Sequence, residues 1–108
     1  MRKKYEMIYC IVNAGFAEDV MDAARECGAS GGTVISARGT ANQEAEKLFN
    51  ITIQPEKEIV MILVTSDLKE PILHALYKKV GLESPGQGIA FSMPVDNVVG
   101  LSTNKKDN

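Results

Sequence analysis

Three short segments of this 108-residue chain carry residue types that could bind a small ligand. The segment 31–33 reads Gly-Gly-Thr, where two residues without a Cβ atom let a ligand approach the backbone and a hydroxyl can form a hydrogen bond. The segment 86–88 reads Gly-Gln-Gly, and backbone N–H groups of glycine-rich turns can surround phosphate oxygens. The third is a polar stretch from Arg38 to Asn50, longer than most connections in a compact domain and therefore a candidate functional loop.

Each of these segments also has a purely structural interpretation. Both glycine segments could be tight turns without a ligand, because a lone Gly-x-Gly is a weak signal. The Walker pattern, GxxxxGK followed by Ser or Thr, is absent from the sequence. The polar stretch has no apolar face, so we expect a loop there with at most one helical turn.

The other reactive side chains form no catalytic or metal-ligating pattern. His74 is the only histidine and falls among charged residues of a predicted helix, so we expect it to be exposed. Cys10 and Cys27 lie in apolar patterns, which predicts buried and unreactive thiols. No metal-ligand spacing occurs. The sequence therefore predicts a binding protein rather than an enzyme, with no metal.

The composition limits the class of protein and its partners. A formal net charge of −2 leaves no concentrated basic face for a nucleic acid. No apolar run approaches the roughly 18 residues of a spanning helix, so no membrane insertion is expected. The cysteines form no pair, and the start lacks a signal-peptide core, which predicts a cytoplasmic protein. The length fits a single domain, 1–108, with flexible tails at about 1–4 and 103–108.

The apolar pattern predicts an α+β fold. Met7 to Val12 is a continuous apolar run, typical of a strand buried on both faces. Apolar residues recur at helical spacing from Phe16 to Cys27, and again along a helix that begins near Ser66 and ends at Gly81. The other predicted strands are 33–37, 58–65 with an extension back to 51 that is interrupted near Pro55, and 89–99 with an interruption at Pro94.

This β-α-β-β-α-β order is the ferredoxin-like arrangement, a sandwich in which two helices cover one face of a four-stranded antiparallel sheet. The first and third strands are apolar on both sides, so the face without helices also needs to be covered. Association of identical chains is the simplest way to cover it, and we therefore expect a homo-oligomer.

The sequence resembles the PII and PII-like signalling proteins (nitrogen regulatory protein P-II family) along nearly its whole length. Gly-Gly-Thr-Val at 31–34 is similar to their Gly-Met-Thr-Val turn, and Gly-Gln-Gly at 86–88 is similar to the centre of their B-loop. The stretch 39–50 occupies the place of their T-loop. Strand residues also match; these are Pro55, the run 59–64, Phe91, Pro94, Val95 and Val98.

The resemblance implies a homotrimer that binds an effector, an adenine nucleotide (ADP, AMP or ATP), in clefts between subunits. Segment 31–33 would contact the adenine, the backbone of 86–88 would surround the phosphates, and the T-loop root would approach the ligand. The ligand would order the loop and so control a target protein, such as a transporter or an enzyme, for example in nitrogen or carbon metabolism. The implied binding residues are Gly31, Gly32, Thr33, Arg38, Gly39, Gly86, Gln87 and Gly88.

The chain also departs from the family pattern. Three positions that are basic in typical members hold Ile89, Gly100 and Ser102. Charge-assisted hydrogen bonds contribute roughly 1.5–3 kcal/mol each, so a ligand with fewer phosphates than ATP, or another small anion, is favoured. The loop is shorter, and it lacks the family's modified Tyr and the Gly-Arg-Gln sequence tied to 2-oxoglutarate and magnesium. The chain is therefore identified as a divergent member with a shortened T-loop.

Two alternatives remain open from the residues. A ferredoxin-like hydrolase of the acylphosphatase type would need an anion-binding Arg in the first loop, where residues 13–16 provide none. A ligand-free assembly module would keep the trimer after its binding site had decayed. The missing basic residues favour this second alternative.

Overall fold

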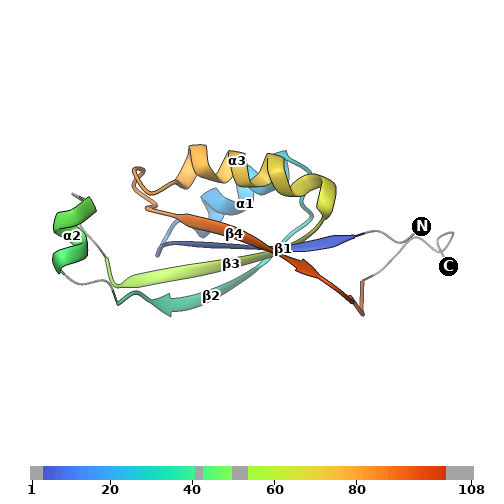
Figure 1. The fold of residues 1–108 in the computed structure, drawn as a ribbon, viewed down its shortest axis with the longest axis horizontal. Coiled ribbons are helices and arrows are strands. Elements are labelled where there is room, and N and C mark those ends of the chain that lie inside the picture. Colours follow the sequence, from blue (N-terminus) through green and yellow to red (C-terminus); the bar gives the residue numbers. More distant parts are fainter. Residues whose placement is uncertain (1–3, 41–42, 50–53, 102–108) are drawn as a thin grey trace, which may run out of the picture.

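The computed structural model describes residues 4–40, 43–49 and 54–101. One sheet with strand order β2-β3-β1-β4 carries α1 and α3 on one of its faces (Figure 1). The elements are β1 (Tyr5–Asn13), α1 (Ala17–Glu26), β2 (Thr33–Arg38), α2 (Gln43–Phe49), β3 (Glu56–Thr65), a 3-10 turn (Ser66–Leu68), α3 (Lys69–Val80) and β4 (Ile89–Val95).

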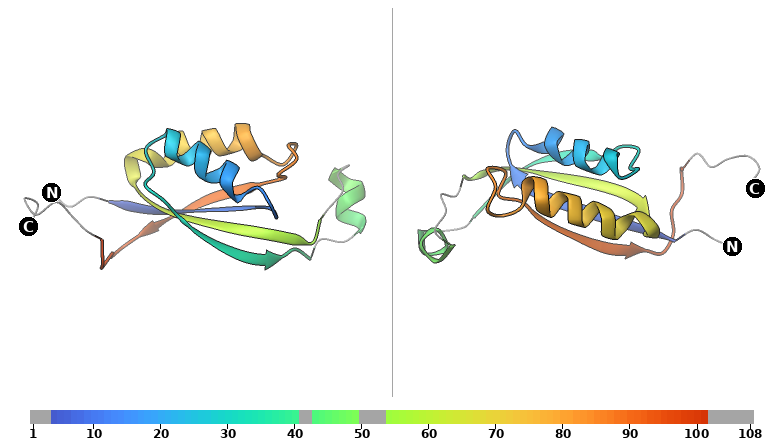
Figure 2. Two further views of the ribbon diagram at one scale, coloured as in Figure 1. Left: turned by 180° about the vertical axis from the view of Figure 1, so that it is seen from behind. Right: turned by 90° about the horizontal axis from the view of Figure 1, so that it is seen from above.

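All strand pairs are antiparallel, which confirms the ferredoxin-like prediction. The two long helices lie side by side over the sheet, while α2 lies apart from it at the end of the β2–β3 hairpin (Figure 2). The core fills the layer between α1, α3 and the sheet. Its largest fully buried side chains are Ile8, Val12, Val20, Val60, Ile62, Ile72, Leu76 and Val80, with Cys10 among them.

Burial in β1 alternates, which corrects the prediction of a strand buried on both faces. Ile8, Cys10 and Val12 point toward the helices and are fully buried, whereas Met7 and Tyr9 on the other face are only half-buried. Side chains alternate between the two faces of a strand. Within the single chain only the helix side is covered, and the second face stays open.

The helix α1 begins without a cap from its own N-terminal residue. Phe16 at the N-cap position makes no side-chain hydrogen bond, and the Glu58 carboxylate of β3 accepts from the N–H groups of Gly15 at 2.9 Å and Ala17 at 3.2 Å instead. Free N–H groups and a positive dipole at the helix start favour such an acceptor. After the helix, Gly28 has the positive φ of +111° that ends many helices, as predicted.

Three predicted boundaries were wrong in detail. The polar stretch contains the seven-residue helix α2 rather than a single turn, because Glu, Lys, Ala and Leu all have high helix propensity. The strand β4 continues through Pro94 and ends at Val95, not at residue 99; β4 is an edge strand, where a missing N–H is tolerated. The helix predicted near Ser66 begins as a 3-10 turn.

Other expectations fall on parts of the chain that the structure does not describe. These are the strand extension at 51–53 and both predicted tails apart from Lys4. Pro55 precedes β3 directly, so the described strand begins only at Glu56.

Candidate functional site

The glycine-rich turn 86–88 lies at the end of the sheet where β1 ends. Asn13, the last residue of β1, binds this turn three times. Its N–H donates to the Gly86 carbonyl at 2.8 Å, and its side-chain Nδ2 donates to the Pro85 carbonyl at 3.0 Å and to Gln87 Oε1 at 3.2 Å. Asn13 is 4% exposed and is the buried polar residue of the described core. The turn is therefore fixed to the central strand by the backbone N–H and the amide side chain of one residue, Asn13.

Packing explains two of the residues in this turn. A Cβ atom on Gly88 would lie 2.9 Å from Val12 Cγ1 and would collide with the Val80 carbonyl oxygen. Gly86 is buried against Val80 and Phe16. Both glycines thus have a structural reason for their identity that is independent of any ligand.

The backbone of this turn is largely occupied by internal hydrogen bonds. The Gln87 N–H donates to the Ser84 carbonyl at 3.0 Å, and the Gly88 N–H donates to the Val80 carbonyl at 2.6 Å. Gln87 itself has a φ of +48°, in the left-handed region that few residues with a side chain adopt. In this conformation the turn presents the Gln87 side chain, rather than these two N–H groups, to a ligand.

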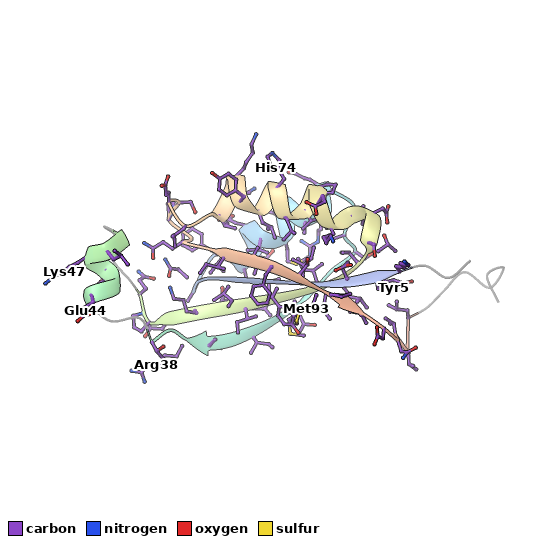
Figure 3. All side chains as sticks on the ribbon, viewed as in Figure 1. Tyr5, Arg38, Glu44, Lys47, His74 and Met93 are labelled. Carbon is purple, nitrogen blue, oxygen red and sulfur yellow. The ribbon has the colours of Figure 1, made fainter. Side chains whose placement is uncertain are left out.

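The root of the polar stretch lies at the same end of the sheet. The Gly39 N–H donates to the Pro55 carbonyl at 2.6 Å, which closes the base of the hairpin that carries α2. Arg38 is exposed, and its side chain extends away from the helix layer (Figure 3). Arg38 is therefore not brought to the glycine-rich turn within one chain.

Lys57 of β3 connects the two regions, and sequence reasoning missed it. Its ammonium group donates to Asn13 Oδ1 at 2.7 Å, and a Cβ atom on Gly39 would lie 3.0 Å from its Cε atom. Burial lowers the pKa of the Lys57 ammonium below its usual value. In the sequence Lys57 is one of three consecutive charged residues, and only the strand register distinguishes it from Glu56 and Glu58.

The segment 31–33 lies at the start of β2, on the opposite edge of the sheet from β4. A Cβ atom on Gly32 would meet the Met61 carbonyl at 2.8 Å, whereas Gly31 has open space around it. Thr33 is exposed and belongs to the row Thr33–Met61–Tyr9–Phe91 across the four strands. At the usual strand spacing, three steps separate its backbone from β4 by about 14 Å. One chain alone thus does not bring the two glycine segments together.

The sheet face opposite the helices is apolar over all four strands. One row across it consists of isoleucines, and in the next row the Tyr9 and Phe91 rings stack with their centroids 5.3 Å apart. Met93 lies on this face below the sheet in Figure 3. The apolar residues of this open face are Met7, Tyr9, Ile11, Ile35, Ile59, Met61, Leu63, Ile89, Phe91, Met93 and Val95.

The remaining reactive groups do not assemble a second site in the described ranges. His74 points outward from α3, as expected (Figure 3). Cys10 is buried, and burial raises the pKa of its thiol to about 12, while Cys27 is half-buried with its Sγ 3.7 Å from the Pro71 carbonyl oxygen. No three His, Cys, Asp or Glu side chains among residues 4–40, 43–49 and 54–101 gather as metal ligands. None of the helices in those ranges is long and apolar enough to cross a membrane.

Comparison with known proteins connects this chain to one family. The family model described as nitrogen regulatory protein P-II matches residues 5–105. A similar relative is the nitrogen fixation nifHD region glnB-like protein 1 of Methanococcus maripaludis, which is 29% identical over 99 residues. That match covers 91% of this chain and 94% of the relative.

Solved structures share the fold at low sequence identity. A putative PII-like signalling protein from Thermus thermophilus superposes with a TM-score of 0.66 at 15% identity, over 86% of this chain and 87% of that one. The GlnK–ATP complex of B. subtilis superposes with a TM-score of 0.66 at 17% sequence identity, over 88% of this chain and 84% of that chain. Arabidopsis thaliana PII bound to citrate superposes with a TM-score of 0.68 at 22% identity, over 93% of this chain and 82% of that chain.

Proposed function

The chain belongs to the nitrogen regulatory protein P-II family, and from that premise we propose that it binds an adenine nucleotide between the subunits of a homotrimer. As a member of this family it is a signalling protein and not an enzyme, so the acylphosphatase alternative is set aside. The bound nucleotide then controls a target protein, a transporter or an enzyme, through the segment 39–50 that carries α2.

One observation carries this proposal: the two glycine segments lie at opposite edges of the same sheet, beside an open apolar face. A ligand that touches both segments must therefore bind where one edge of a chain meets the other edge of a neighbour. When the open faces of identical chains pack together, the β2 edge of one chain can lie beside the β4 edge of its neighbour. The same packing removes the apolar face from water.

The ligand class is an adenine nucleotide with few phosphates. Ile89 and Gly100 provide no positive charge at two of the positions that are basic in typical members, which favours AMP or ADP over ATP. The GlnK relative was solved with ATP and the Arabidopsis PII with citrate, so proteins with this fold accept small anions.

The first test is thermal unfolding of the purified protein with ATP, ADP or AMP. Ligand at about 100 times its Kd adds roughly 2.7 kcal/mol to the free energy of unfolding, which raises the Tm measurably. We expect Thr33→Ala to weaken nucleotide binding roughly 2- to 13-fold, because one hydrogen bond is lost. Thr33→Ser keeps the hydroxyl and should bind like the wild type.

Two results would contradict the proposal. A wild-type protein that is monomeric in solution has no cleft between subunits. A trimer whose Tm no nucleotide raises would instead favour the ligand-free assembly module, which the missing basic residues also support. In that case a target should still bind through the segment 39–50.

A further inference from the structure

We draw no further inference here: the strongest candidate, the exposed apolar side chain of Leu48 on α2 at the end of the β2–β3 hairpin, lies in the segment 39–50 that the proposed function already assigns to the target protein, and nothing among the described residues shows what covers it.

Discussion

At the residue scale, the glycines of the two candidate segments differ in the space that a Cβ atom would find. Gly88 is fixed by packing, because a Cβ atom there would collide with the Val80 carbonyl oxygen and approach Val12. Gly31 has no atom within 4 Å of that position. Only Gly31 thus leaves open space in which a ligand can approach the backbone.

This difference gives a matched pair of variants. Gly88→Ala should lower the free energy of unfolding by about 1–3 kcal/mol, because backbone and side chain must move to fit the methyl group. Gly31→Ala should change it by no more than about 0.5 kcal/mol. Urea unfolding of both variants measures the two values. Equal stability of Gly88→Ala and the wild type would show that the turn adapts freely.

At the element scale, the start of α1 depends on a strand that is distant in sequence. The Glu58 carboxylate receives two N–H groups there, while Phe16 offers no side-chain acceptor. The same turn, 13–17, begins with Asn13, whose side chain binds the glycine-rich turn through Pro85 and Gln87. Neighbouring residues of β3, Lys57 and Glu58, thus connect that strand to Asn13 and to the start of α1.

We expect Glu58→Ala to lower the free energy of unfolding by about 1–2 kcal/mol, the usual effect of losing a helix cap. Glu56→Ala, two residues away and exposed, is the control and should have little effect. Glu58→Gln keeps an acceptor oxygen and should fall between them. Thermal unfolding at neutral pH gives the Tm of each of the three variants. If Glu58→Ala has the same Tm as Glu56→Ala, the Glu58 carboxylate does not stabilise the helix.

At the scale of the whole molecule, the open sheet face decides how the chain associates. Apolar side chains cover it on all four strands, and each large apolar side chain that becomes buried contributes about 1.5–3 kcal/mol. Phe91 lies on this face, on the edge strand β4, and is 41% exposed in the single chain, stacked on Tyr9. A charge placed there would remain buried in the proposed trimer without a partner.

Phe91→Lys should therefore break the trimer into monomers, as sedimentation velocity or light scattering would reveal. Tyr77→Lys is a matched control, because Tyr77 is also aromatic and is 75% exposed, but on the outer side of α3. The control should keep the wild-type mass. A Phe91→Lys protein that remains trimeric would place the interface elsewhere on the molecule.

The sequence by itself determined the order of the four strands and the two long helices, and with it the class of fold. Continuous apolar runs predicted the strands, and helical spacing predicted α1 and α3, because these patterns reflect burial against one common core. The resemblance on 31–34 and 86–88 pointed to the family that the match over 5–105 establishes. The helix α2 escaped prediction because its short, mostly polar sequence shows no repeated helical spacing of apolar residues.

Only the tertiary structure decided which polar side chains meet. Lys57 and Gln87 are 30 positions apart, and Asn13 is distant from both; strand register and the path of the final turn place them in hydrogen-bonding range. The strand order separates Thr33 from the glycine-rich turn, because β2 and β4 are the opposite edges of the sheet. The hydrophobic pattern fixes which face a residue occupies, but its cross-strand partner on a strand distant in sequence is decided only when the sheet assembles.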